Sequence, residues 1–289
     1  MMKVIEKIEE YSVENSTRYI FSLHDGSIVE MAVFIHKEQL HFCVSSQVGC
    51  PVGCLHCATT YAPIQYRRNL NTIELCSMIE YVLGKEDFYK DRVLSFSGHG
   101  EPTLNWDTVV KVKLYFHKTF NKFYVTTIGN RDIFKKLIEK KETDSVFYLS
   151  LHGSTDEERA WLMPNAKTFC SLDELVSFVH MYSEQGGKVV INYMLHKYNS
   201  DKACLDRVIQ LMRGNNHNVS LRFTEFNQIG GNTNIVGLSD VEIESVLSYF
   251  EARMNQSMKW SYRYSRLEGK DIGIACGQLR ADIVKGKDK

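Results

Sequence analysis

Hydrophobic positions along the chain change their spacing near residue 42. Before that point, apolar and polar residues alternate over short stretches, which predicts strands at 17–23 and 27–34. The pair Asp25-Gly26 lies between them and is a strong hairpin-turn signal. From residue 43 onward, apolar runs of strand length alternate with stretches of helical spacing. We therefore predict a small N-terminal β extension over residues 1–42 and an α/β region over residues 43–289.

The α/β region is predicted to contain repeated strand and helix pairs. The expected strands are 42–46, 93–97, 123–127, 146–151, 188–195 and 219–223, with amphipathic helices such as 72–83, 133–141 and 172–185 between them. This alternation is typical of a parallel sheet flanked by helices, either a partial barrel or an open doubly wound sheet. In both arrangements the chemistry lies at the carboxyl ends of the strands.

Unusual sequences follow several of these predicted strands. They are a cysteine-rich loop, Gly98-His99-Gly100-Glu101-Pro102, Thr126-Thr127-Ile128-Gly129, Ser150-Leu151-His152 and Phe226-Asn227. Because the carboxyl ends of parallel strands share one edge of a sheet, we expect these segments to converge.

The cysteine-rich loop carries the strongest chemical signal in the chain. Cys50, Cys54 and Cys57 provide three soft thiolates at close spacing, which suits an iron–sulfur cluster with one iron left open for a ligand. A structural zinc site completed by Cys43 or His56 is the alternative. The glycines at 98 and 100 allow close backbone approach, and the Glu101 carboxylate could accept hydrogen bonds from an ammonium group.

Charge, hydropathy and cysteine content limit the substrates and cellular compartments that this chemistry could serve. The 289 residues carry 35 basic and 35 acidic side chains, so any contact with RNA must come from a local patch. The chain has no apolar run of membrane-spanning length and no signal-peptide pattern at its start, which predicts a cytoplasmic protein. Its eight cysteines are too sparse for a secreted disulfide framework and indicate reduced thiols, metal ligation or catalysis.

Together these motifs resemble the RlmN/Cfr class of radical S-adenosylmethionine (SAM) methyltransferases, which modify adenine in RNA. The likeness runs from Glu30 to the C-terminus. It is carried by Cys43 to Cys50, the cysteine-rich loop, Arg68-Asn69-Leu70, Gly100-Glu101-Pro102, Ser150-Leu151-His152, Asp156-Glu157 with Arg159, Phe226-Asn227 and Ala275-Cys276-Gly277-Gln278-Leu279. The resemblance implies a radical SAM partial (β/α)6 barrel.

The same resemblance implies a two-cysteine mechanism. Cys276 would take a methyl group from one SAM, and a second SAM would be cleaved reductively at a [4Fe-4S] cluster held by Cys50, Cys54 and Cys57. The deoxyadenosyl radical would remove hydrogen from the Cys276 methyl group. A carbon radical can add to an electrophilic adenine carbon that cannot attack SAM. Cys43 would then attack Cys276, forming a transient disulfide and releasing the product.

Other site residues are carried over position by position from the resemblance. Glu30, thirteen residues before Cys43, would be the proton-accepting glutamate; its alternative is an exposed acid on a hairpin strand. The expected SAM contacts are Gly100, Glu101, Thr126, Ser150, Leu151, His152 and Asn227. Cys76, Cys170 and Cys204 are expected to be core or surface thiols.

Departures from the family pattern concern the substrate more than the reaction. Only about forty residues precede the first cluster strand, which suggests a short form without the usual N-terminal accessory domain. His99 and Tyr198 differ from the familiar versions. Residues 259–266 alternate aromatic and basic side chains and could stack bases and meet phosphates; a half-buried edge strand is the alternative.

The sequence-based hypothesis is therefore methylation of carbon 2 or carbon 8 of an adenine in rRNA or tRNA through Cys276. The alternative is the same carrier-cysteine chemistry on a nucleotide, peptide or small metabolite. A zinc-binding interaction module is a third reading. The hypothesis further includes a reducing partner such as flavodoxin, no membrane association and a monomeric chain.

Overall fold

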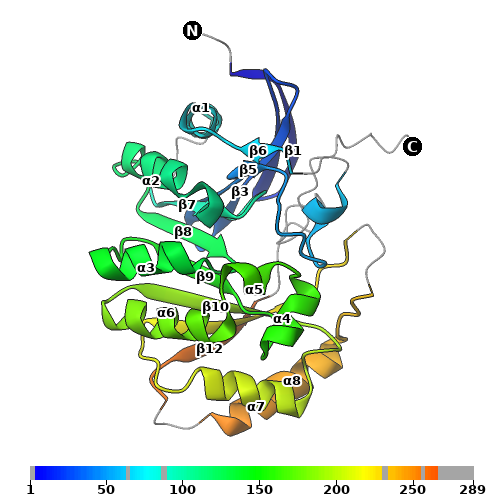
Figure 1. Cartoon of the computed structure of the whole chain (residues 1–289). Coiled ribbons are helices and arrows are strands. Elements are labelled where there is room, and N and C mark those ends of the chain that lie inside the picture. Colours follow the sequence, from blue (N-terminus) through cyan, green and yellow to red (C-terminus); the bar gives the residue numbers. More distant parts are fainter. Residues whose placement is uncertain (1–3, 63–65, 86–89, 230–233, 255–257, 266–289) are drawn as a thin grey trace, which may run out of the picture. The chain divides into compact units, whose positions relative to one another are not determined.

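The computed structural model describes residues 4–62, 66–85, 90–229, 234–254 and 258–265. These residues divide into two compact units (Figure 1). Unit 1 contains the described parts of 4–51 and 57–121, and unit 2 contains those of 52–56 and 122–265. Cys276 and the rest of 266–289 lie outside the described residues.

Unit 1 contains a mixed sheet with the strand order β1-β2-β3-β4-β7. Its strands are β1 (Ile5–Val13), β2 (Ser16–Leu23), β3 (Ile28–His36), β4 (Gln39–Val44) and β7 (Arg92–Phe96). Strands β1 to β4 pair antiparallel, and β4 pairs with β7 in parallel. The predicted hairpin is confirmed, because β2 and β3 pair across the turn at Asp25-Gly26, where Gly26 has φ 75°.

Short elements complete unit 1. They are β5 (Gln47–Val48), η1 (Ala58–Tyr61), β6 (Arg68–Asn69), α1 (Thr72–Leu83), η2 (Pro102–Asn105) and α2 (Trp106–Tyr115). Helix α1 begins where predicted because Asn71 and Glu74 form a reciprocal capping box at its N-terminus. Arg68 connects the hairpin turn to this helix through ion pairs with Asp25 at 2.7 Å and Glu74 at 2.9 Å.

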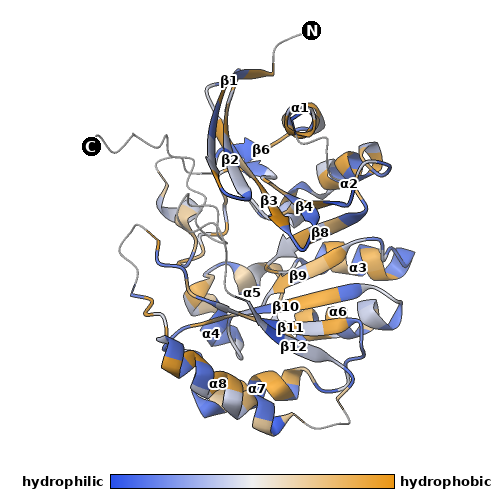
Figure 2. Cartoon of the chain, turned by 180° about the vertical axis from the view of Figure 1, so that it is seen from behind, coloured by the Kyte–Doolittle hydropathy of each residue, from blue (hydrophilic) through white to orange (hydrophobic). Residues whose placement is uncertain are grey.

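Unit 2 contains a parallel sheet with the order β8-β9-β10-β11-β12. Its strands are β8 (Lys122–Thr127), β9 (Val146–Ser150), β10 (Lys188–Leu195), β11 (Val219–Glu225) and β12 (Ser261–Ser265). Strand β10 is buried over seven consecutive residues from Val189 to Leu195, and Figure 2 shows its hydrophobic character. Burial on both faces is the reason for its nearly continuous apolar run, which only Asn192 interrupts between Val189 and Leu195.

Six helices belong to unit 2. They are α3 (Arg131–Lys140), α4 (Asp156–Leu162), α5 (Ala166–Phe169), α6 (Leu172–Glu184), α7 (Lys202–Leu211) and α8 (Asp240–Arg253). Helices α3 and α6 pack together through the stacked rings of Phe134 and Phe178, whose centroids lie 3.6 Å apart. Ser171 caps α6 and Ser239 caps α8, each in a capping box.

The predicted α/β class with parallel strands is confirmed. The six strands expected in the α/β region are all present, and Lys188–Leu195 has the expected bounds. Strand β11 continues two residues past its predicted end, to Glu225. None of the helices in the described part of the chain is long and apolar enough to span a membrane.

Candidate active site

The cysteine-rich loop follows the short strand β5. Gly49 and Gly53 both have φ 71°, a left-handed conformation that glycine adopts without strain. Two contacts within unit 2 fix the middle of the loop: the Leu55 amide donates to the Leu162 carbonyl at 2.9 Å, and the Asn165 amide group donates to the Val52 carbonyl at 3.0 Å. The α4–α5 segment thus anchors the residues around Cys54.

The cysteines of the described residues fall into two groups. Cys43, Cys50, Cys54 and Cys57 are cysteines of intermediate exposure. Cys76, Cys170 and Cys204 are buried, and burial raises their thiol pKa values to about 11, 12 and 12. The latter three are therefore poor nucleophiles, as expected for core thiols.

The donor set of the loop fits an iron–sulfur cluster. Three partly exposed cysteines on one loop are the soft ligands that such a cluster requires. Within the described ranges, no three His, Cys, Asp or Glu side chains lie close enough together to hold a single metal ion. The loop therefore provides ligands of the right kind for a cluster rather than a preformed site for a single metal ion.

The segment after β7 packs tightly against the segment after β4. A Cβ atom added to Gly98 would lie 2.6 Å from Oγ of Ser45, and one added to Gly100 would lie 2.6 Å from Cβ of Gln47. The Glu101 amide donates to Oε1 of Gln47 at 2.9 Å. Both glycines are thus required by close backbone approach, and Gly100 also has φ 99°.

Glu101 presents a buried carboxylate at this strand end. It is 3% exposed, and its Oε1 accepts hydrogen bonds from the amide and hydroxyl groups of Thr103, at 3.1 and 2.7 Å. These bonds fix the direction of the carboxylate at the start of η2. A carboxylate held in this way is a suitable partner for a ligand ammonium group.

Glu30 lies inside unit 1 and is completely buried. Its carboxylate forms an ion pair with Arg18 from the neighbouring strand β2, and Nε2 of His99 lies 3.8 Å from Oε2 of Glu30. Arg18 and His99 are themselves 5% and 1% exposed. The alternative interpretation of Glu30 as an exposed acid is therefore wrong.

Glu30 and Cys43 lie on the same face of adjacent strands. In the β3–β4 register Ala32 is opposite Cys43, and Glu30 is two residues from Ala32 along β3. Since side chains alternate between faces along a strand, Glu30, Ala32 and Cys43 share one face. The Ser45 hydroxyl also donates to the Glu30 carbonyl oxygen at 2.6 Å.

Other predicted residues lie at strand ends in unit 2. Thr126 is the next-to-last residue of β8, Ser150 is the last residue of β9, and Asn227 lies two residues after the end of β11. Ser150 and Asn227 are buried, whereas Thr126 is partly exposed. The expected convergence at one edge is confirmed for these members of the parallel sheet of unit 2.

The buried side chain of Arg159 connects the backbone segments that follow β8 and β9. Its guanidinium donates to the carbonyl oxygens of Ser150 at 3.1 Å, Leu151 at 3.4 Å and Ile128 at 2.9 Å. It is 1% exposed, and burial lowers the pKa of its guanidinium from the ordinary value. Carbonyl dipoles thus compensate a buried cation and hold the segments after β8 and β9 together.

The segment 259–266 has a structural role in its described part. Tyr262 on β12 packs against Phe250, with ring centroids 5.1 Å apart, and Trp260 is 4% exposed beside the same ring. Arg263 points outward and is exposed. The alternation of rings and cations is therefore that of a half-buried strand, as in the alternative interpretation.

The sequence reasoning missed Arg18, Trp161 and His196. For Arg18 a signal was present: the hairpin turn fixes a register in which Ile20 is opposite Glu30, so Arg18 lies diagonally across from Glu30 on the same face. Opposite charges at such positions indicate a cross-strand pair.

Comparisons with known proteins agree with this geometry. The model of the radical SAM superfamily matches residues 44–211. A protein of Flavobacterium johnsoniae named "Probable dual-specificity RNA methyltransferase RlmN" is 31% identical over 95% of this chain and 77% of its own length. A Thermotoga maritima protein of the same name is 29% identical over 99% of this chain and 81% of its length.

Solved structures show the same fold. The crystal structure of a radical SAM methyltransferase from Sphaerobacter thermophilus aligns with a TM-score of 0.85 at 23% identity, covering 96% of this chain and 82% of that one. SuiB of Streptococcus suis bound to S-adenosylmethionine aligns with a TM-score of 0.56 at 15% identity, covering 78% and 50%.

A parallel α/β fold with a three-cysteine loop and polar strand ends defines a radical SAM enzyme. The chain belongs to the radical SAM superfamily and, within it, to the RlmN family of methyltransferases. The cofactors of this class are a [4Fe-4S] cluster and SAM, which decides against the structural zinc alternative for the cysteine-rich loop.

Proposed function

We propose that this chain methylates an adenine carbon of RNA, with Cys276 as the carrier of the methyl group. RNA as the substrate rests on the relatives named as RNA methyltransferases, which this chain matches over nearly its whole length. The observation in the structure that supports the chemistry best is the placement of a fully buried Glu30 on the same face as Cys43 of the adjacent strand.

Each of these residues has a defined task in the proposed reaction. Glu30, paired with Arg18, accepts the proton lost from the adenine carbon. The one electron that the adduct radical must also lose would return to the cluster. Cys43 then attacks the sulfur of Cys276; the new S–S bond forms as the C–S bond to the adenine-bound methylene breaks, and the electron pair of that bond takes up a proton, which completes the methyl group of the product. The resulting disulfide is reduced by two electrons before the next turnover.

The residues assigned to the cofactors follow from the family resemblance. Cys50, Cys54 and Cys57 would hold the cluster, whose chemistry would be the one-electron reduction of SAM. The SAM contacts are assigned to Gly100 and Glu101 for the amino group, Thr126 for the ribose, Ser150, Leu151 and His152 for one wall, and Asn227 for the adenosyl moiety. The directed carboxylate of Glu101 and the bond network of Arg159 support these assignments.

We expect the protein to act as a monomer in the cytoplasm, on rRNA or tRNA, with a flavodoxin-like protein as the reductant. The methylated nucleoside identifies the acceptor as carbon 2 or carbon 8 of adenine, so the proposed experiment measures that nucleoside directly.

The experiment incubates anaerobically prepared holoenzyme with SAM, a reductant and total RNA, followed by mass spectrometry of the digested nucleosides. A C-methyladenosine should form with the wild-type protein and not with Cys276→Ala. Cys76→Ala is the matched control, because Cys76 is a buried thiol with a pKa of about 11 in α1 and should methylate RNA like the wild type.

Two results would contradict the proposal. Equal product from Cys276→Ala would remove the carrier role of that residue. Label from SAM that enters free nucleotides or a peptide, and not RNA, would favour the non-RNA alternative instead.

A further inference from the structure

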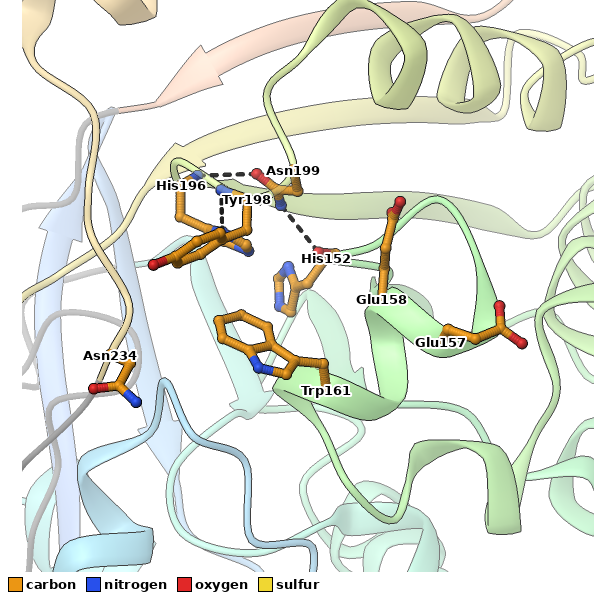
Figure 3. A pocket seen from close by; sticks show the side chains of 8 residues that line it. All are labelled: His152, Glu157, Glu158, Trp161, His196, Tyr198, Asn199 and Asn234. Atoms are coloured by element: carbon orange, nitrogen blue, oxygen red, sulfur yellow. Dashed lines mark hydrogen bonds between the residues drawn. The ribbon is translucent and has the colours of Figure 1, made fainter.

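A cavity of about 510 Å³ opens at the carboxyl ends of β9 and β10 in unit 2 (Figure 3). It is lined by His152, Trp161, His196, Tyr198, Asn199 and Asn234, together with two glutamates of α4. The volume lies in the range of small-molecule sites. Among the residues assigned above to SAM, His152 alone belongs to this lining.

Two exposed aromatic side chains, Trp161 and Tyr198, line the cavity. Trp161 is 42% exposed and Tyr198 is 55% exposed, with ring centroids 5.2 Å apart and planes 65° apart. Figure 3 shows the Trp161 ring, from α4, and the Tyr198 and His196 rings, from the segment after β10, near one another. Exposed aromatic rings beside a cavity are typical of surfaces that stack a flat ligand.

The imidazoles of His152 and His196 have hydrogen bonds that make Nε2 the donor nitrogen of each ring. Nδ1 of His152 accepts a bond from the Met194 amide at 3.1 Å, and Nδ1 of His196 accepts one from the Tyr198 amide at 3.2 Å. Burial lowers the pKa of His196 to about 4 and that of His152 well below its ordinary value, so both rings are neutral at pH 7. A neutral imidazole that accepts at Nδ1 carries its hydrogen on Nε2.

One of these donors has no acceptor. His196 is 2% exposed, and its Nε2 makes no hydrogen bond with any residue in the described ranges. The Trp161 ring lies near it, with centroids 5.8 Å apart. A buried donor without a partner destabilises a fold, so a ligand acceptor at this position would be favoured once the exposed indole shifts to admit it.

The charge of the cavity disfavours phosphate. Glu157 and Glu158 have pKa values lowered by hydrogen bonds, which outweigh the opposing desolvation of Glu158, so both are ionised at neutral pH. Arg207 balances Glu158 through an ion pair of 2.6 Å. No lysine or arginine is found in the lining formed by the described residues. A neutral ring with a hydrogen-bond acceptor suits these surroundings better than an anionic group.

We propose that this cavity binds an unstacked adenine base of the RNA strand, with its ring against Trp161 and Tyr198 and a ring nitrogen accepting from Nε2 of His196. Adenine fits because its ring nitrogens are acceptors and its faces stack on aromatic side chains. The inference rests on the proposed function and adds a base-binding site to it.

The test measures the affinity of the holoenzyme for a fluorescently labelled oligoadenylate, by anisotropy, against the same strand with abasic positions. Trp161→Ala should weaken binding of oligoadenylate by about tenfold to a hundredfold, as expected for loss of one stacked base. Trp161→Phe keeps a ring and should remain within about threefold of the wild type. The abasic strand should bind all variants equally weakly.

A matched control is Tyr115→Ala, which removes an aromatic ring that is 61% exposed on α2, outside the cavity lining, and should bind and methylate RNA like the wild type. His196→Phe preserves a flat ring without the donor and should weaken oligoadenylate binding. Thermal unfolding of each variant separates lost binding from lost folding.

Unchanged affinity in folded Trp161→Ala and Tyr198→Ala, or equal binding of the abasic strand, would overturn the inference. If the wild type methylates RNA and these variants bind normally, the cavity proposal fails while the proposed function stands. If oligoadenylate binds through Trp161 but no RNA is methylated, the proposed function fails while the base site stands.

Discussion

The two units bury ionisable groups in opposite ways. In unit 1 the carboxylate of Glu30 is buried with an oppositely charged partner, Arg18. In unit 2 the buried imidazoles of His152 and His196 are neutral, because burial lowers their pKa values. The carboxylate of unit 1 is thus compensated by a cation, whereas the rings of unit 2 avoid charge and favour a neutral ligand. The proposed base site makes use of the second arrangement.

The largest effect is expected from breaking the ion pair of unit 1. Arg18→Met leaves the Glu30 carboxylate buried without its guanidinium partner and should lower the free energy of unfolding by about 3–5 kcal/mol. Urea denaturation measures this change. Adding Glu30→Gln to Arg18→Met should recover most of the loss, because the uncompensated charge is then removed.

An exposed ion pair provides the control for this variant. Lys7→Met removes the partner of Glu9 on β1, and solvent screening should leave the unfolding curve unchanged. An Arg18→Met protein as stable as Lys7→Met would show that the buried pair is not what stabilises unit 1.

A smaller effect is expected from the buried cation of unit 2. Arg159→Leu removes the donors for three carbonyl groups but leaves no opposite charge behind, so unfolding should become easier by about 1–3 kcal/mol. Since these carbonyls belong to the assigned SAM wall, the KM for SAM should also rise. Wild-type stability and KM in this variant would contradict the positioning role of Arg159.

The neutral imidazole of unit 2 predicts a pH dependence. The pKa of His196 is lowered to about 4 from an ordinary 6.5, although the nearby Glu158 opposes the shift. The unfolded chain therefore takes up this proton first, and the stabilisation is present above pH 6.5 and is lost as the pH falls toward 4. Between pH 7.5 and 5.5 this group should contribute a loss of about 1–2 kcal/mol.

The measurement compares urea unfolding of the wild type and His196→Phe at the two pH values. The variant should show a smaller loss, because it has no group to protonate at this position. Identical pH dependence in both proteins would mean that His196 is not buried as a neutral ring.

The smallest effect concerns the anchor of the cysteine-rich loop. Asn165→Ala removes the hydrogen bond to the Val52 carbonyl and should reduce stability by about 1 kcal/mol and lower the iron content per chain. Asn216→Ala removes an exposed amide that bonds Glu184 and serves as the control. Equal iron retention in the two variants would separate cluster binding from this anchor.

Local signals predicted much of the fold correctly. Helix α1 and strand β10 have their predicted bounds, because the helix starts with a capping box and the strand is an apolar run interrupted only by Asn192. Strand β11 is longer than predicted because polar residues such as Thr224 and Glu225 remain paired to β10 after the apolar run has ended. Apolar periodicity alone cannot show where ladder pairing stops.

Fewer features of the site than of the fold could be predicted from the sequence, because its contacts join residues far apart in the chain. The motif residues Gly100 and Glu101 were found because their local sequence is unusual, but the reason for Gly100, its close approach to Gln47, is a contact across 53 positions of the chain. The cavity residues Trp161 and His196 come from segments 35 residues apart and form no local pattern. Such neighbours become visible only when the parallel strands are assembled.

The most direct test of the proposed mechanism is peptide mass spectrometry of the purified holoenzyme after anaerobic incubation with SAM. One added methylene mass is expected on the peptide that contains Cys276, and none on the peptides of Cys76, Cys170 or Cys204. An unmodified Cys276 in protein with an intact cluster would contradict that mechanism.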